Sequence, residues 1–283
     1  MIGAIPTQKV VKLPYPHPGQ QAVRRQARRF NILSAGRRWR KTTLLVSVAI
    51  EAAVAGKRIM WGAPTFDQVR VAWGECKHSS GGVADFKQQT MTMTFPTKGT
   101  VIFRSLDDPD NARGHTVDGI VIDEAGDVKE AAWYEVLRPM LIDTGGWAWL
   151  IGTPKGRNWF WREYIGASDR EDAISWQIPT LGCKLLDGDL VREPHPLENP
   201  NILFSEIYNI WQTTPEATFR QETLAEFVEG EGAVFRNILA CLKAPKDAKP
   251  EDHTEHRVVA GLDWAKSQDF TAQVLCAPIV GKS

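Results

Sequence analysis

Residues 30–43 of the chain read FNILSAGRRWRKTT, an apolar run followed by a basic loop that ends in Lys41 and Thr42. A strand, a loop and a helix in this order are typical of the phosphate-binding pattern G-x-x-x-x-G-K-[ST]. That pattern has glycine at the positions occupied here by Ala35 and Arg40. A lone Lys-Thr pair before a helix is common, so this stretch by itself leaves open whether it forms a nucleotide site.

A phosphate-binding loop works mainly through its backbone. Successive N–H groups and a helix N-terminus point at the phosphates, a lysine reaches the outer pair, and a hydroxyl binds Mg²⁺. Here Lys41 and the Thr42 hydroxyl are the candidates for the last two roles. The residues expected to surround the phosphates are Gly36, Arg37, Arg38, Trp39, Arg40, Lys41, Thr42 and Thr43.

A pair of acidic residues follows a second apolar strand. Gly119–Ile122 reads as a buried strand, and Asp123 and Glu124 come directly after it. One carboxylate is thereby placed to hold a hydrated Mg²⁺, and the next to orient and deprotonate a water beside the γ-phosphate. Acidic residues also favour helix N-caps, which is the structural alternative for the pair. The loop and the acidic pair together favour an ATP site with Mg²⁺.

Strand-like and helical segments alternate along the first part of the chain, as in a mostly parallel sheet flanked by helices. The expected strands are 30–34, 58–62, 119–122 and 147–151, with a hairpin at 90–95 and 100–103. The expected helices are 42–55 and a segment from Phe66. Open α/β sheets bind ligands at the carboxyl ends of their strands, so we expect the site at that edge.

Composition limits the class of protein. With 283 residues, 43% hydrophobic and 24% charged, the chain has the composition of one large or two modest globular domains. No apolar run reaches the roughly 20 residues of a membrane span, and the N-terminus lacks the pattern of a secretory signal. The four cysteines form no C-x-x-C pair. We expect a soluble, cytosolic protein without a zinc site or a membrane partner.

Charge is unevenly distributed although the formal net charge is zero. Residues 1–60 contain twelve Lys or Arg and a single acidic residue, Glu51. This imbalance indicates an anionic partner for the N-terminal part. The alternative is a solvated basic helix with no ligand, carrying Arg24, Arg25, Arg28 and Arg29.

Several short motifs follow one another along nearly the whole chain. They are Pro16–Gln20, similar to the adenine-recognising Q motif, then Gly36–Thr42, Arg113-Gly114, Asp118–Ala125, Leu137-Arg138-Pro139 and Ile151–Pro154. Their order and spacing resemble those of the large terminase subunits, which package DNA into the capsids of tailed phages. In that family an arginine commonly replaces the early glycines of the loop. Arg40 departs from the family, which usually keeps glycine before the lysine.

The resemblance implies a P-loop NTPase fold of the additional-strand, catalytic-glutamate (RecA-like) class, an α/β fold with a mostly parallel sheet flanked by helices and a small lid subdomain. It implies that Gln20 reads the adenine edge and that Lys41 and Thr42 hold the phosphates and Mg²⁺. It also implies that Asp123 completes the Mg²⁺ shell and that Glu124 activates water.

Further roles follow from the same resemblance. Gly152 and Thr153 lie in the coupling motif, where Thr153 senses hydrolysis; ordinary loop hydrogen bonding is the alternative. An arginine that reaches the developing charge on the γ-phosphate accelerates hydrolysis. Arg138 is the candidate for such a finger between subunits and Arg37 the competing candidate within one subunit, with a surface salt bridge as the structural alternative for Arg138.

Four segments are expected. Residues 1–154 form the core of the ATPase domain with its adenine-binding segment, and residues 155–241 complete that domain and add a lid or linker subdomain of short helices broken by prolines. Residues 242–256 have the composition of a linker. Residues 257–283 resemble the start of an RNase H-like nuclease that uses Mg²⁺ or Mn²⁺, with Asp263 as the first metal ligand. We expect a fragment in which that nuclease site is incomplete and inactive.

The resemblance also implies partners. They are double-stranded DNA bound without sequence preference, the small terminase subunit, the portal protein of the procapsid and further copies of the chain in a homo-oligomeric ring, with a monomer in isolation as the alternative. The expected location is the cytoplasm of an infected bacterium. Two other functions stay open: a helicase-like DNA translocase, and a non-hydrolysing DNA-binding or scaffold protein whose loop Arg40 has disabled. Our hypothesis for Arg40 is that the site still binds ATP, but less well than a glycine version.

Overall fold

The computed structural model describes residues 10–186, 188–228, 259–263 and 272–276. The chain separates into two compact units, Met1–Gly232 and Ala233–Ser283. The described residues of the second unit form one antiparallel pair, β11 (Val259–Asp263) and β12 (Ala272–Cys276). Asp263 is therefore the last residue of a strand, while the expected linker and the rest of the expected nuclease segment lie outside the described residues.

The larger unit is built on an eight-stranded sheet in the order β3-β4-β5-β2-β6-β7-β1-β8. Its strands are β1 (Phe30–Ala35), β2 (Arg58–Ala63), β3 (Asp85–Lys87), β4 (Thr92–Thr94), β5 (Thr100–Ser105), β6 (Gly119–Ile122), β7 (Trp147–Gly152) and β8 (Ala173–Ile178). In this spatial order, every neighbouring pair from β5 through β2, β6, β7 and β1 to β8 is parallel. Strands β3 and β4 extend the sheet beside β5 with antiparallel pairing. The predicted hairpin is confirmed as β4 and β5.

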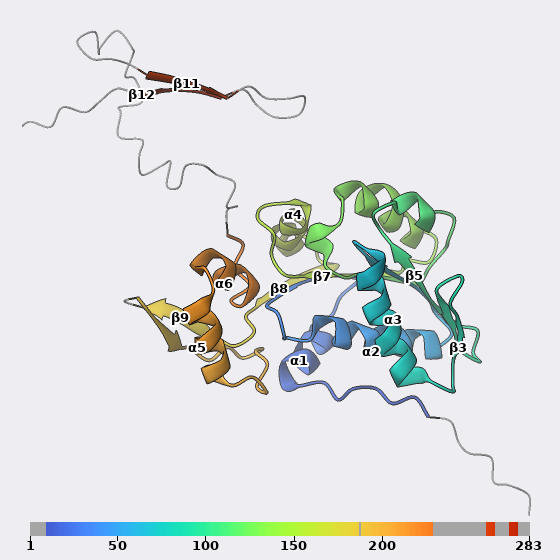
Figure 1. The fold of residues 1–283 in the computed structure, drawn as a ribbon. Helices are drawn as coiled ribbons and strands as arrows, with labels where there is room; N and C mark the ends of the chain where they lie inside the picture. Colours follow the sequence, from blue (N-terminus) through green and yellow to red (C-terminus); the bar gives the residue numbers. More distant parts are fainter. Residues whose placement is uncertain (1–9, 187, 229–258, 264–271, 277–283) are drawn as a thin grey trace, which may run out of the picture. The chain divides into compact units, whose positions relative to one another are not determined.

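Helices cover both faces of this sheet (Figure 1). The α-helices described in the larger unit are α1 (Pro18–Gln26), α2 (Lys41–Val54), α3 (Phe66–Ser80), α4 (Trp159–Gly166), α5 (Phe204–Thr213) and α6 (Glu216–Glu222). One face carries α1, α2 and α3, and the other carries α4 and short helical turns between residues 125 and 141. In the described part of the chain, none of the helices is long and apolar enough to span a membrane.

Two of the helices begin at capping boxes that the sequence encodes. The side chain of His17 accepts a hydrogen bond from the backbone of Gln20, whose side chain accepts one in return, and Pro18 opens α1. Thr65 and Gln68 make the same reciprocal pair at the start of α3. Each box satisfies N–H groups that a helix start otherwise leaves without an acceptor.

The strand order brings the predicted site together. Strand β7 lies between β1, which leads into the basic loop, and β6, which leads into the acidic pair. Because these three strands are parallel, the loop at 36–40, the pair Asp123-Glu124 and the segment Gly152-Thr153 all follow strands at the same edge of the sheet. Strand β7, which lies between β1 and β6, is the additional strand of the expected fold class.

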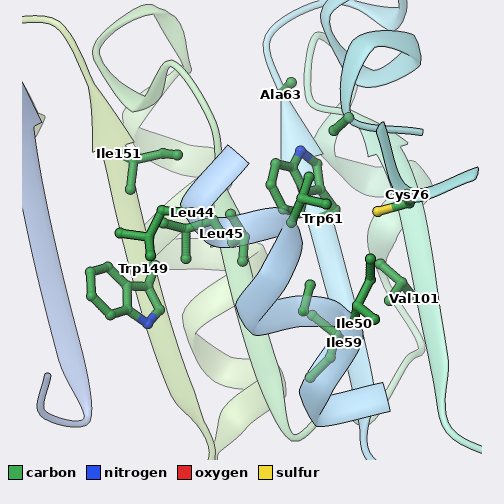
Figure 2. Packing of buried hydrophobic residues seen from close by; sticks show 14 of the residues in the cluster. Leu44, Leu45, Ile50, Ile59, Trp61, Ala63, Cys76, Val101, Trp149 and Ile151 are labelled. Atoms are coloured by element: carbon green, nitrogen blue, oxygen red, sulfur yellow. The ribbon is translucent and has the colours of Figure 1, made fainter. Parts of the chain in front are cut away.

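One apolar core fixes α2 against the sheet. Figure 2 shows Leu44, Leu45 and Ile50 of this helix among side chains of β2, β5 and β7, including Trp61 and Trp149. These side chains are at most 3% exposed. Burial of each large apolar side chain stabilises the fold by about 1.5–3 kcal/mol, so the start of α2 and the loop before it are held on a rigid base.

The opposite face and the C-terminal part have cores of their own. Trp133, Leu137 and Phe160 pack on the second face of the sheet. A small third core joins α5, α6 and the hairpin of β9 (Cys183–Leu186) and β10 (Asp189–Arg192). The region after residue 154 contains the expected short helices, α4, α5 and α6, but also three strands that were not expected, β8, β9 and β10. β8 completes the sheet by pairing with β1.

Candidate functional site

The loop between β1 and α2 contains two residues with left-handed backbone, Arg38 with φ 66° and Arg40 with φ 67°. Such a conformation costs a residue other than glycine roughly 1–2 kcal/mol. Arg40 is the N-cap of α2, the position at which the phosphate-binding pattern has glycine. The structure thus shows Arg40 in the conformation that glycine adopts most easily, with α2 beginning directly after it.

Gly36 marks a close approach between this loop and the segment after β8. A Cβ atom on Gly36 would lie 2.4 Å from Thr180 Oγ1 and 2.5 Å from the carbonyl oxygen of Thr223. The Gly36 N–H donates to the carbonyl of Ile178 at 2.9 Å. A side chain at position 36 would push the loop away from residues 178–223, so this glycine is required by packing.

Lys41 is buried at the start of α2. Its Nζ donates to the carbonyl oxygens of Ala35 at 2.7 Å and Gly36 at 3.4 Å. Burial lowers the pKa of Lys41, and the nearby charges of Glu124 and Asp123 oppose that shift. The ammonium group therefore contacts the carbonyl groups at the start of the loop and lies close to the acidic pair that follows β6.

The loop and the acidic pair meet through a direct hydrogen bond. Thr42 Oγ1 donates to Asp123 Oδ2 at 2.9 Å, and the Glu124 N–H donates to Asp123 Oδ1 at 3.1 Å. Burial, followed by the charge of Glu124, raises the pKa of Asp123 to about 6. Thr42 and Asp123, both predicted to hold Mg²⁺, are 81 positions apart in sequence and directly hydrogen-bonded in the structure; their binding of Mg²⁺ stays a prediction.

Glu124 contacts the segment that follows β7. Its Oε2 accepts a hydrogen bond from the Thr153 N–H at 3.4 Å, and its own backbone is left-handed with φ 47°. A Cβ atom on Gly152 would lie 3.2 Å from the Ala125 nitrogen and 3.4 Å from Glu124 Cα. The two coupling residues predicted from the sequence thus lie against the glutamate predicted to activate water. The contact uses the Thr153 backbone, so the role of its hydroxyl stays a prediction.

Arg37 is turned toward the C-terminal part of the larger unit. Its Nε lies 2.6 Å from Glu222 Oε2, and its N–H donates to the Glu222 carbonyl at 2.7 Å. Its side chain remains 74% exposed. Sequence reasoning missed Glu222, since nothing in the sequence of α6 distinguishes it from Glu216, the other acidic residue of that helix. The role of Arg37 within its own subunit stays a prediction.

Gln20 lies beside the loop, where a pocket opens. Its side-chain amide accepts from the His17 N–H at 3.0 Å and donates to the Arg40 carbonyl at 2.9 Å. Gln20 and Arg40 also line a pocket together with Tyr15, which is 90% exposed. The further lining residues include Leu13, Arg24, Thr43, Ser47 and Glu51. The structure thus places Gln20 at a pocket beside the loop with its amide already bonded, and adds Tyr15, an aromatic residue that the sequence motif did not single out.

Arg138 lies away from the loop of its own chain. Its guanidinium packs over the ring of Phe30 at 5.5 Å, and Phe30 is the first residue of β1, whereas the loop follows its last residue. Arg29 and Arg170 approach the same ring, but each has a carboxylate partner, Asp172 and Glu163 respectively. Among the described residues Arg138 has no such partner. The structural alternative of a salt bridge is therefore not observed.

The oxygen groups at the loop suit Mg²⁺. Mg²⁺ is commonly held by one or two protein oxygens together with substrate phosphates and water. The Thr42 hydroxyl and the Asp123 carboxylate provide such a pair, 2.9 Å apart. Across the residues that the structure describes, no group of three or more His, Cys, Asp or Glu side chains forms a metal site of another kind.

Fold and site together define the class: an α/β fold of the P-loop NTPase type, with the additional strand between the loop strand and the acidic strand. Comparison with known proteins finds more specific similarities within this class, although no family model matches the chain. The large terminase subunit of Thermus phage G20c is 25% identical over 305 residues, covering 90% of this chain and 59% of that protein. The large terminase subunit of Thermus virus P23-45 is 26% identical over 297 residues with the same coverage.

The solved structures that resemble this chain are also large terminases. The ATPase domain of the large terminase from Thermus phage P74-26 has a TM-score of 0.58 and 25% identity, covering 76% of this chain and 94% of that domain. The large terminase of another thermophilic bacteriophage, solved in complex with ADP, has a TM-score of 0.57 and 16% identity, covering 94% of this chain and 65% of that chain; at this identity it shows the fold alone. The chain is similar to large terminase subunits, as its motifs predicted, and it spans 59% of the length of the curated relatives.

Proposed function

We propose that this chain is the ATPase part of a DNA-packaging motor, a large terminase subunit that hydrolyses ATP to move double-stranded DNA. The observation that carries the proposal is the hydrogen bond between Thr42 and Asp123, with Glu124 beside it in contact with Thr153. These contacts join the phosphate loop, the acidic pair and the coupling segment, three parts that hydrolysis and its mechanical use require.

In the proposed reaction the chain's own groups bind and orient the substrate. The N-terminus of α2 and the Lys41 ammonium bind the phosphates, once Lys41 leaves the carbonyls of Ala35 and Gly36. Thr42 and Asp123 would hold Mg²⁺, which supplies charge neutralisation at the outer phosphates. Glu124 orients a water and accepts its proton. The nucleobase enters the pocket beside Gln20 and Tyr15.

The position of Arg138 favours a role between subunits. It lies at the start of β1, away from the loop of its own chain, and among the described residues no carboxylate neutralises it. A guanidinium held by an aromatic ring keeps its full charge for an external anion. We propose that Arg138 reaches the triphosphate bound by a neighbouring copy in a ring, and that Arg37 acts within its own subunit after release from Glu222.

The remaining parts of the proposal follow the resemblance to the relatives. The N-terminal basic segment contacts DNA phosphates, the small terminase subunit and the portal protein are partners, and the protein works in the cytoplasm of the infected bacterium. A nuclease domain that uses Mg²⁺ or Mn²⁺ begins near β11, with Asp263 as its first ligand. This chain alone has no nuclease activity on this proposal; metal-dependent cleavage of plasmid DNA by the pure chain would contradict it.

ATP turnover separates the motor from a scaffold with a disabled loop. We expect Mg²⁺-dependent turnover by the chain, a loss of about 10²-fold or more in Glu124→Gln, and unchanged ATP binding in that variant. Glu135→Gln, at an exposed glutamate, is the matched control and keeps full turnover. ATP binding without turnover in the unaltered chain would favour the scaffold. A helicase-like translocase is disfavoured because the relatives and solved structures that the chain resembles are large terminase subunits.

A further inference from the structure

The loop between β1 and α2 is held in place by its carbonyl groups. Four consecutive carbonyl oxygens, those of residues 37–40, each accept a hydrogen bond from a side chain of another segment. The donors are Thr180 Oγ1 to Arg37, Asn199 Nδ2 to Arg38 at 2.8 Å, His17 Nε2 to Trp39 at 3.1 Å and Gln20 Nε2 to Arg40 at 2.9 Å. All four donors are buried.

Backbone partners fix the orientation of these donors. The Oδ1 atom of Asn199 accepts from the N–H of Asn201, so its Nδ2 must face the Arg38 carbonyl. Gln20 is fixed in the same way by the His17 N–H. His17 Nδ1 accepts from the Gln20 N–H, which leaves the proton on Nε2, and burial lowers the pKa of His17. Each of the three side chains is thus a committed donor to the loop.

Some of the N–H groups of the same loop and of the start of α2 have no hydrogen-bond acceptor among the described residues. Those of Gly36, Arg37 and Trp39 donate to backbone carbonyls. Among the described residues no acceptor is bonded to the N–H groups of Arg38, Arg40, Lys41, Thr42 or Thr43. An anion-binding loop needs N–H groups that are free to donate to the anion. Here, within the part of the chain that the structure describes, the carbonyl groups are bonded to side chains, and several N–H groups remain free to donate.

We propose that Thr180 and Asn199, together with His17 and Gln20, are positioning residues that hold the loop in shape and support the left-handed backbone of Arg38 and Arg40. Glycine adopts a left-handed backbone without a steric penalty, whereas Arg38 and Arg40 adopt it at a cost. Hydrogen bonds to the carbonyls of these two residues, from Asn199 and Gln20, offset that cost and keep the N–H groups directed at the phosphates. This inference rests on the proposed nucleotide site and adds the residues that shape it.

The test is a double-substitution cycle that measures ATP affinity by calorimetry with the full chain. We expect Asn199→Ala to weaken ATP binding roughly three- to tenfold, the range of one buried hydrogen bond. In an Arg38→Gly background the same change has less than about a twofold effect, because glycine needs no support in the left-handed region. Thr180→Val, which removes the second donor from the C-terminal side, weakens binding in the same direction.

Asn31→Ala is the matched control, because Asn31 is equally buried and donates to backbone carbonyls at the start of β1, remote from the loop. It lowers the melting temperature without weakening ATP binding. The inference is overturned if Asn199→Ala leaves affinity unchanged, or weakens it equally in both backgrounds, while the unaltered chain binds ATP. Absence of ATP binding by the unaltered chain overturns the proposed function itself.

Discussion

Arg40 is where the chain departs most from the phosphate-binding pattern, and the structure changes what that departure means. Its backbone is left-handed in the folded chain, with φ 67°. The steric cost of that conformation therefore falls on folding. The carbonyl of Arg40 is bonded to Gln20, so the residue is supported in this conformation. We infer that Arg40 is a tolerated part of the loop and not a lesion that disables it.

Replacing Arg40 by glycine tests this inference. We expect Arg40→Gly to raise the free energy of unfolding by up to about 1 kcal/mol, because the left-handed strain disappears, partly offset by the greater freedom of glycine in the unfolded chain. Denaturant unfolding measures the change. Arg70→Gly, within α3, is the control and lowers stability by about 1 kcal/mol. Destabilisation by both substitutions would show that the Arg40 side chain contributes more than its strain costs.

Asp123 gives the site a pH dependence. Its pKa is raised to about 6 by burial and by Glu124, so a proton occupies the carboxyl below that pH. Because the pKa is raised in the folded state, Asp123 contributes to the free energy of unfolding at low pH. That contribution is lost as the pH rises from the ordinary range of a carboxyl through about 6. For Mg²⁺ the proton competes, so affinity for Mg²⁺ with ATP falls up to about tenfold per pH unit below 6.

The measurement is Mg²⁺ affinity in the presence of ATP between about pH 5 and 8. Protonation of ATP itself affects every variant, so the comparison is with Asp123→Asn, which lacks the titrating carboxyl. We expect weak Mg²⁺ binding and a shallower pH dependence in that variant. Identical pH slopes in the two proteins would exclude Asp123 as the group that responds.

At the scale of elements, the strand order determines which predicted residues meet. The pattern of apolar runs predicted β1, β2, β6 and β7 and the edge of the sheet at which their loops gather, because each run is long and clearly bounded. β8 escaped prediction because its residues 173–178 mix polar and apolar side chains within a proline-rich region. The hairpin of β9 and β10 escaped for the same reason.

The supports of the loop could not be predicted from the sequence at all. Thr180 and Asn199 are more than a hundred residues from the loop in sequence and belong to no motif. They reach it because β8 pairs with β1, which carries the following segment to the loop. By contrast, Lys41, Thr42 and Asp123 were predictable, because their chemistry requires fixed residue types directly after a strand.

Arg138 provides a prediction about contacts between copies of the chain. We expect Arg138→Ala to lower ATP turnover at least about tenfold at protein concentrations where copies associate, with unchanged nucleotide affinity, because removing an arginine finger slows hydrolysis strongly in related chemistry. Turnover per chain is measured against protein concentration. Arg162→Ala, at an exposed ion pair with Glu130, is the control.

Mixing variants shows where Arg138 acts. Arg138→Ala retains its own Glu124, and Glu124→Gln retains its own Arg138, so a mixture of the two restores part of the turnover if the arginine acts on a neighbour's nucleotide. Turnover in the mixture no greater than the sum of the separate proteins would contradict the proposed role between subunits.

For the whole molecule, the balance of charge predicts how DNA binds. A translocating motor must treat every base pair alike, so we expect contacts to phosphates, weak affinity of a single copy and a steep loss of affinity with salt. Arg25→Glu, in the last turn of α1, should weaken binding equally for all sequences. Fluorescence anisotropy with two unrelated duplexes across a salt series measures this. A strong preference for one duplex at moderate salt would contradict it.

The central claim is that this glycine-poor loop is a working phosphate site. The most direct measurement is a calorimetric titration of the chain with ATP and Mg²⁺, repeated with Lys41→Ala. We predict saturable binding of one ATP per chain that Lys41→Ala weakens at least about tenfold, the loss expected when a charged hydrogen-bond donor is removed from a buried site. No saturable binding by the chain, or equal binding by Lys41→Ala, would contradict the claim.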